Sequence, residues 1–222
     1  MANIIAFMFI GQTPRPDVMD DVRASLGGDI LALEYGALDG LDREEIAKLK
    51  PESDKDTLIT KLQDGPEVHV SGAAVEKLLK KQIAKAEKDG AQLCAIMCTG
   101  SFRINSKGPV ITADQAFHGK NSLGPARSIG VIVPLKEQQD TFAGHYDGSG
   151  YNIIMGSADP YGNTEDIIAE ARRLADAGAD MIRLDCMGYT AAQASAARAA
   201  AGLPVITPRI EIIRLIQTQR IE

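Results

Sequence analysis

The sequence has 222 residues, 45% of them hydrophobic and 24% charged, and a chain of this length can bury roughly 70% of its unfolded surface without a disulfide or metal. Its net charge of −6 argues against nucleic-acid binding, which depends on clustered lysine and arginine, and no apolar run approaches the ~20 residues of a membrane span. The odd number of cysteines, three, and a start without basic residues argue against secretion, so we predict a cytoplasmic protein.

Short apolar runs alternate with helical patterns along the whole chain. Residues 4–10 (IIAFMFI) predict a buried strand, because the run is too short and too rich in β-branched and aromatic residues for a buried helix. The other predicted strands are residues 30–35, 68–70, 93–97, 129–133, 153–155, 181–184 and 205–206. Helical patterns occupy residues 17–26, 41–51, 73–88, 165–177, 191–201 and 211–219. Strands that alternate with helices imply right-handed βαβ units, so the sequence predicts an α/β fold with mostly parallel sheets.

An internal repeat predicts two pseudo-symmetric lobes. A Gly-Ala pair at residues 90–91 precedes Cys98, and a second pair at residues 178–179 precedes Cys186. In both copies the cysteine lies eight residues after the first glycine (98 − 90 and 186 − 178), and another glycine stands two residues after the cysteine. Each copy follows a long alanine-rich helical pattern. We therefore expect each lobe to be a mostly parallel sheet flanked by helices.

The repeat also sets the expected boundaries of the lobes. Residues 1–115 are predicted to form the first α/β lobe, with an insertion near residues 36–66, and residues 116–222 the second. The last helical pattern, residues 211–219, could return to the first lobe or pack on a second subunit, which leaves a homodimer open. Because ligands of open parallel sheets bind beyond the carboxyl ends of the strands, we expect the active site in a cleft between the lobes.

The two repeated cysteines carry the chemistry that we predict. Cys98 and Cys186 each follow a predicted strand, where Gly100 and Gly188 allow backbone N–H groups to approach a carboxylate closely. The positive end of a helix would lower a thiol pKa from its usual ~8.5 towards neutrality. If the lobes face each other, one thiolate can remove a proton from an acidic carbon while the other thiol delivers one to the opposite face. This arrangement predicts a racemase, epimerase or isomerase that needs no metal and no organic cofactor.

Further candidates would bind the carboxylate of the substrate. Hydroxyl and backbone N–H groups at strand ends can hold a carboxylate, and arginine can hold it bidentately. The candidate substrate-binding residues are Thr13, Arg15, Thr99, Gly100, Ser101, Pro134, Gly188, Tyr189 and Thr190. Thr13 and Thr190 could instead cap helices, Arg15 could be solvated, and Asp185 could orient a loop or pair with a cation. Cys94, in the middle of a predicted strand, is expected to be a core residue, and no histidine has metal-ligand spacing to it.

Four stretches carry a resemblance to a known family. They are residues 10–15 (IGQTPR), residues 41–46 followed by Pro51-Glu52, residues 130–134 (GVIVP) and residues 184–188 (LDCMG), and together they span nearly the whole chain. With these stretches the chain resembles the AroM family, a relative of the aspartate/glutamate and hydantoin racemase superfamily. The resemblance to the superfamily implies a pseudo-symmetric two-lobe fold, a cofactor-independent reaction and one catalytic cysteine per lobe, here Cys98 and Cys186. The usual Cys-Asn-Thr and Gly-Cys-Thr motifs of that superfamily read Cys-Thr-Gly-Ser and Asp-Cys-Met-Gly in this chain. The resemblance to AroM itself implies no particular reaction.

Other functions compete with two-thiol isomerisation. A single cysteine would suffice to protonate the enolate left by decarboxylation of a malonate-like acid, and a thiol could add to an activated alkene during maleate-type cis–trans isomerisation. A protein that binds a small carboxylate without turnover is the main rival, and the reactivity of the thiols discriminates between them. The sequence contains no phosphate-binding G-x-x-x-x-G-K-[ST] loop, no G-x-G-x-x-G after a strand and no G-x-S-x-G elbow.

Overall fold

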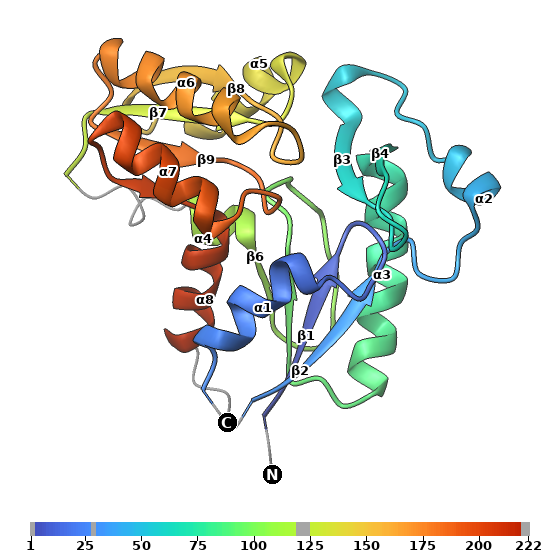
Figure 1. Ribbon diagram of the computed structural model, residues 1–222. Coiled ribbons are helices and arrows are strands. Elements are labelled where there is room, and N and C mark those ends of the chain that lie inside the picture. The colour runs from blue at the N-terminus through green and yellow to red at the C-terminus, as the bar shows by residue number, and fades with distance from the viewer. Residues whose placement is uncertain (1–2, 28–29, 119–124, 219–222) are drawn as a thin grey trace. The chain divides into compact units, whose positions relative to one another are not determined.

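The structure is a computed structural model that describes residues 3–27, 30–118 and 125–218 (Figure 1). The chain divides into two compact units. The first, called the first lobe below, comprises Met1–Asp114 and Ile212–Glu222, and the second lobe comprises Gln115–Glu211. None of the helices within the described ranges combines the length and the apolar character needed to span a membrane.

The first lobe is built on a four-stranded parallel sheet. Its strands are β1 (Asn3–Phe9), β2 (Ile30–Gly36), β5 (Leu93–Ile96) and β6 (Val110–Thr112), in the order β2-β1-β5-β6. Figure 1 shows α1 (Pro16–Ser25) and α3 (Gly72–Lys88) on either side of β1 and β2. The short strand β6 and the helix α4 (Ala113–His118) that follows it were not predicted, because three residues are too few for a periodic pattern.

An insertion between β2 and α3 holds a helix and a hairpin. Helix α2 (Arg43–Ala47) begins with a capping box on Asp42 and is shorter than the helical pattern over residues 41–51. A 3₁₀ turn, Asp54–Asp56, leads into β3 (Thr57–Lys61), which pairs antiparallel with β4 (Glu67–Ser71). The sequence predicted β4 but missed β3, whose ends are polar. Ser71 then caps α3 by accepting the N–H of Ala74 at 3.2 Å.

The second lobe repeats the topology of the first. Its parallel strands β7 (Ser128–Val133), β8 (Asn152–Ser157), β9 (Met181–Leu184) and β10 (Val205–Ile206) lie in the order β10-β9-β7-β8. In both sheets the first strand of the lobe lies between the second and the third, and the fourth lies outside the third. This confirms the predicted α/β fold with two similar lobes, and it makes β5 and β9 equivalent. The helices and 3₁₀ turns of the second lobe include Lys136–Gln138, α5 (Gln139–Ala143), Gly144–Tyr146, α6 (Thr164–Asp176) and α7 (Ala191–Ala201). The last helix, α8 (Pro208–Thr218), begins in the second lobe, and its residues from Ile212 onward belong to the first.

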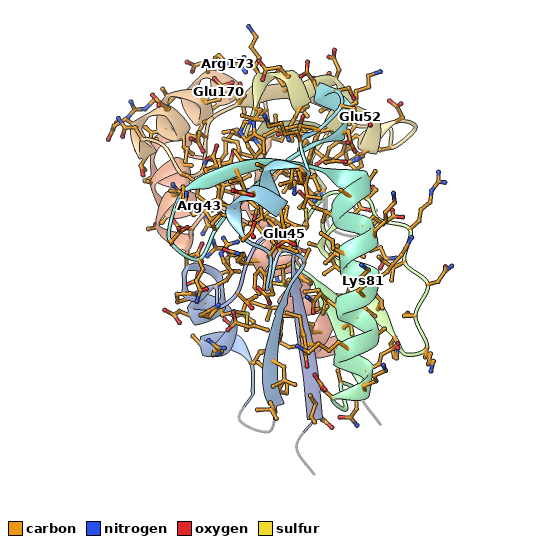
Figure 2. All side chains as sticks on the ribbon, turned by 90° about the vertical axis from the view of Figure 1, so that its right-hand side faces the viewer. Arg43, Glu45, Glu52, Lys81, Glu170 and Arg173 are labelled. Atoms are coloured by element: carbon orange, nitrogen blue, oxygen red, sulfur yellow. The ribbon has the colours of Figure 1, made fainter. Side chains whose placement is uncertain are left out.

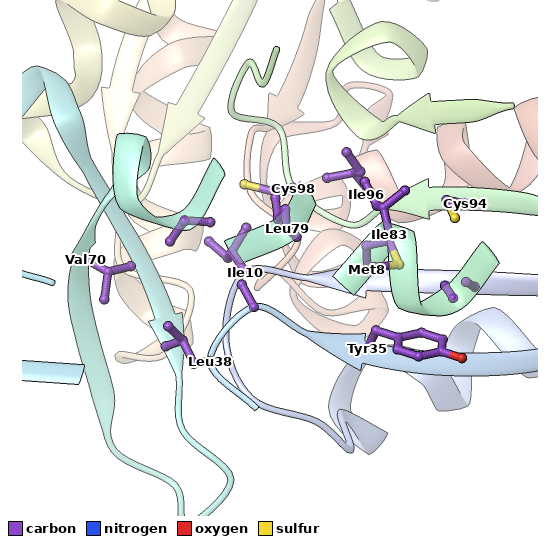
Figure 3. Packing of buried hydrophobic residues seen from close by; sticks show 14 of the residues in the cluster. Met8, Ile10, Tyr35, Leu38, Val70, Leu79, Ile83, Cys94, Ile96 and Cys98 are labelled. Carbon is purple, nitrogen blue, oxygen red and sulfur yellow. The ribbon is translucent and has the colours of Figure 1, made fainter. Parts of the chain in front are cut away.

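Each sheet buries its faces under helices. In the first lobe, Val75, Leu79, Ile83 and Ala86 form the buried face of α3, a helix that the sequence predicted at residues 73–88. They pack on alternate residues of β1 and β5, including Cys94, and on Cys98 just beyond β5, in one hydrophobic cluster (Figure 3). In the second lobe α6 and α7 cover the sheet face that contains Ile132. Helix α5 covers the opposite face, which contains Val131 and Val133. Strands β5 and β9, which lead to Cys98 and Cys186, are therefore both held in place by buried apolar contacts.

Candidate active site

Cys98 lies two residues beyond the end of β5. The N–H of Met97 donates to the carbonyl oxygen of Met8 at 2.8 Å, so the sheet ladder continues up to the cysteine. The residue is 8% exposed, and its Sγ accepts the backbone N–H of Gly100 at 3.4 Å. Such a hydrogen bond stabilises the thiolate more than the thiol, because the positive end of the N–H dipole faces the sulfur.

Cys186 occupies the equivalent place in the second lobe. It lies two residues beyond the end of β9, and the N–H of Asp185 donates to the carbonyl oxygen of Ile132 at 2.8 Å. Its Sγ accepts the N–H of Gly188 at 3.3 Å, and the residue is more exposed than Cys98. The glycine that follows each cysteine by two residues in the sequence therefore has the same contact in both lobes: its backbone N–H donates to the cysteine sulfur.

The loop that follows Cys186 is held by a buried arginine that the sequence analysis missed. Arg209, 3% exposed at the start of α8, donates from Nε to the carbonyl oxygen of Met187 at 2.9 Å and from Nη2 to that of Gly188 at 3.3 Å. In the first lobe the hydroxyl of Ser101 donates to Asp114 at 3.2 Å. The sequence contains a signal for this arrangement, because Pro-Val-Ile-Thr occurs at residues 109–112 and again at 204–207. Asp114 and Arg209 each lie two positions after the threonine of this repeat, and each contacts the loop that follows a cysteine.

A second buried arginine lies in the strand that leads to Cys186. Arg183, on β9, and Asp185 are both fully buried, and the guanidinium carbon of Arg183 lies 5.8 Å from the centre of the Tyr146 ring. Burial lowers the pKa of Arg183, while the nearby Tyr146, Asp185 and Glu211 act in the opposite direction. Burial also raises the pKa of Tyr146, and the charge of Asp185 raises it further. An arginine inside the apolar run of residues 181–184 was the sequence signal for this charged cluster.

Thr13 and Arg15 follow β1 but are engaged by neighbouring carboxylates. The backbone N–H and the hydroxyl of Thr13 both donate to Asp39, each at 2.7 Å, so Thr13 does not cap α1. Arg15 is 6% exposed and donates from Nε and Nη2 to the carboxylate of Asp17 at 2.8 and 2.7 Å. Its guanidinium also lies 5.6 Å from the ring centre of Phe9. Arg15 is therefore not solvated, and a substrate carboxylate would have to compete with Asp17 for it.

The remaining candidates of the first lobe lie on the loop that begins at Cys98. Thr99 is buried, Gly100 is half-buried and Ser101 is exposed. Cys94, in contrast, lies within β5, where burial and the charge of Glu87 raise the pKa of its thiol to about 11. In the described ranges no three histidine, cysteine or acidic side chains gather in a way that could hold a metal ion.

The candidates of the second lobe have mixed surroundings. Pro134 is buried directly after β7. Tyr189 is fully buried, and its hydroxyl donates to the carbonyl oxygen of Ala158 at 2.6 Å. Thr190 begins α7 with a capping box, in which its hydroxyl accepts the N–H of Gln193 at 3.2 Å and the Gln193 side chain accepts the N–H of Thr190 at 2.8 Å.

Comparisons with known proteins agree with this fold. The sequence model of one family, described as AroM protein, matches residues 5–218. A search of curated protein sequences finds no match.

Solved structures of other proteins have the same fold at low sequence identity. Allantoin racemase from Klebsiella pneumoniae has a TM-score of 0.66 and 15% identity, over 98% of this chain and 87% of that one. Maleate isomerase from Pseudomonas putida S16 has a TM-score of 0.66 and 9% identity, over 98% and 92%. Unliganded arylmalonate decarboxylase has a TM-score of 0.65 and 15% identity, over 99% and 94%.

Proposed function

We propose that this protein, which belongs to the AroM family, is a cofactor-independent racemase, epimerase or isomerase of a small molecule that bears a carboxylate. The observation that carries the proposal is the repeated thiol arrangement. Cys98 lies two residues after β5 and Cys186 two residues after β9, and in each case a glycine N–H faces the sulfur. The names of the similar structures, which include two kinds of isomer-forming enzyme and a decarboxylase, support a reaction of this class.

The proposed reaction uses the two thiols in opposite protonation states. The thiolate of one cysteine takes the proton from the carbon next to the carboxylate, and the electron pair of the broken C–H bond passes into an enolate. The thiol of the other cysteine then donates its proton to the opposite face of that carbon. The glycine N–H groups lower the cost of the thiolate state on either sulfur, so Cys98 and Cys186 exchange roles between the two directions. Ser101, which is exposed on the loop that begins at Cys98, is a candidate for holding the carboxylate, for which it would exchange its hydrogen bond to Asp114.

One observation favours a second candidate reaction. Cys186 is more exposed than Cys98, so the two thiols are unequal. A decarboxylase needs only one of them: the electrons of the broken C–C bond pass into an enolate as CO₂ leaves, and a single thiol donates the proton. In that case we assign the proton donor to Cys186.

Proton exchange measured by NMR in D₂O tests the proposal. Wild-type protein and the variants Cys98→Ser and Cys186→Ser are incubated with amino acids, hydantoins, hydroxy acids and small dicarboxylates. We expect the signal of one α-proton to disappear with the wild type, and exchange to be abolished or confined to one enantiomer in each variant. Cys94→Ala is the matched control, because this cysteine is buried within β5 and should leave exchange intact.

Three results would count against two-thiol chemistry. Exchange that persists in a protein carrying both Cys98→Ser and Cys186→Ser would exclude the two thiols as the acid and the base. A malonate-type acid that loses CO₂ with Cys98→Ser but not with Cys186→Ser would establish the single-thiol reaction instead. A ligand that raises the melting temperature, with no exchange or CO₂ release, would favour a binding protein.

A further inference from the structure

A pocket in the insertion of the first lobe uses none of the residues assigned above to the reaction. Its volume is about 250 Å³, and it lies between α2 and the β3–β4 hairpin, on the face of the molecule shown in Figure 2. The α2 side supplies three residues of the helix and one residue of the segment that follows it. These are Arg43, Ile46, Ala47 and Lys50, and the hairpin side supplies Leu62, Val68 and His69.

The floor of this pocket is apolar. Ile46 and Leu62 are 5% and 6% exposed and belong to the core cluster of the lobe, and Val68 packs against the same cluster. The volume is below the ~300–1,000 Å³ of pockets for drug-sized ligands, so it suits a smaller molecule. The body of that molecule would be aliphatic or aromatic, because water in such a pocket has few polar partners.

Three basic side chains, those of Arg43, Lys50 and His69, line the pocket. Arg43 pairs with Asp64, and His69 Nε2 lies 3.2 Å from the carboxylate of Glu67, so two basic groups already have acidic partners. Lys50 has no hydrogen bond or ion pair with any other residue in the described part of the chain. The neighbouring carboxylate of Glu45 is held in the capping box at the start of α2 by the N–H of Asp42. An anionic group in this pocket could therefore pair with Lys50 without displacing another carboxylate.

We propose that this pocket binds a small monocarboxylate with an apolar body, and that its occupancy alters the Cys98 loop. The body would lie over Ile46 and Leu62, and the carboxylate would pair with Lys50. This class fits the pocket because its one carboxylate can pair with Lys50 while its apolar body covers Ile46 and Leu62, where a buried charge would be costly.

Strand β3 connects the pocket to the Cys98 loop. Leu58, on β3, would lie 3.3 Å from a side-chain carbon added at Gly100, which faces the Cys98 sulfur. A carbon added at Gly11 would lie only 2.4 Å from Thr60 Oγ1, so β3 also packs directly on the segment that leads to Thr13. A molecule that moves Leu62, one residue beyond β3, will shift this strand against both segments, because closely packed groups transmit displacement.

A titration with 4-methylpentanoate tests the binding site. Protein with ¹³C-labelled methyl groups should show saturable shifts at Ile46, Leu62 and Val68, and none at Ile132 in the second lobe. The neutral 4-methylpentanamide should bind more weakly. Lys50→Gln should weaken binding by about twofold to fivefold, the contribution of an exposed ion pair. Lys48→Gln is the matched control, since this lysine is also exposed, lies directly after α2 and does not line the pocket.

The rate of alkylation of Cys98 by iodoacetamide tests the connection. Saturating 4-methylpentanoate should change this rate by about fivefold in the wild type and in Lys48→Gln, and the change should require a higher concentration in Lys50→Gln. An unchanged rate with the pocket occupied would overturn the connection. Equal binding to the Lys50 and Lys48 variants, or shifts confined to methyl groups beside Cys98, would overturn the site itself. These measurements record binding and thiol reactivity only, so they stand or fall separately from the proposed reaction.

Discussion

Arg209 and Met187 are joined by a hydrogen bond of 2.9 Å from the guanidinium Nε to the main-chain carbonyl oxygen. The same guanidinium reaches the carbonyl oxygen of Gly188, so one buried side chain fixes two consecutive peptide groups directly after Cys186. The orientation of these peptides decides where the Gly188 N–H points, and it points at the Cys186 sulfur. We therefore expect Arg209 to act as a positioning residue for the Cys186 loop.

Replacing Arg209 by Gln should destabilise the protein and disturb the Cys186 loop. We expect the free energy of unfolding to fall by about 2–3 kcal/mol, because two carbonyl oxygens lose a charged donor. The alkylation rate of Cys186 should change relative to that of Cys98, which mass spectrometry measures in the same sample. Arg198→Gln is the control: Arg198 also donates to a carbonyl oxygen, that of Val205, but it is exposed and does not contact the Cys186 loop. Equal effects of the two variants on Cys186 would contradict a positioning role.

Tyr189→Phe should separate a structural role of this residue from a substrate-binding one. The buried hydroxyl donates to Ala158, and burial raises the pKa of Tyr189 well above its usual value. Loss of this hydrogen bond should cost about 1–2 kcal/mol in urea denaturation, with the Cys186 alkylation rate unchanged. Tyr151→Phe should cost less, because within the described residues the Tyr151 hydroxyl has no hydrogen bond. Unchanged stability with weaker protection of Cys186 by a ligand would instead place Tyr189 in the substrate site.

Alanine substitutions at the two repeated glycines should have unequal effects. A methyl group at Gly188 would lie 3.0 Å from Pro160 and from the Tyr161 ring, whereas at Gly100 its nearest contact, at 3.3 Å, is the flexible end of Leu58. We expect Gly188→Ala to cost about 1–3 kcal/mol and to slow alkylation of Cys186 as the loop shifts. Gly100→Ala should cost less and should change the Cys98 rate less. Thermal unfolding and alkylation kinetics of both variants check this order, and the reverse order would refute the packing argument.

The pKa of Cys94 makes the stability depend on pH in the alkaline range. The folded protein holds this thiol proton up to a pKa of about 11, whereas the unfolded chain releases it near pH 9. Between pH 9 and pH 11 the folded state therefore binds more protons than the unfolded state. The stability that the protonated Cys94 contributes below pH 9 is lost as the pH rises towards 11. Urea denaturation at pH 8, 9.5 and 11 should show a smaller decline in Cys94→Ala than in the wild type. At pH 8, Cys94 should react with iodoacetamide more slowly than Cys98 or Cys186. A decline of equal size in both proteins would contradict this assignment.

The sequence by itself determined the fold class and the equivalence of Cys98 and Cys186. Both follow from short-range patterns: the apolar runs that predict strands, the spacing that predicts α3, and a local repeat in which a glycine follows each cysteine by two residues. Such patterns are readable because they depend on residues that are close along the chain. The sequence missed the short strands β3 and β6, which owe their pairing to neighbours rather than to periodicity.

Only the tertiary structure decided which polar side chains are buried and what they contact. Arg209 reaches Met187 across 22 residues (209 − 187), and Asp39 reaches Thr13 across 26 (39 − 13). The sequence identified Thr13 and Tyr189 by residue type, but their carboxylate and carbonyl partners come from other segments of the fold. A buried polar group must find a partner, and its partner depends on which segments the packed core brings together. For that reason, residue types at the ends of the strands were predictable and their hydrogen bonds were not.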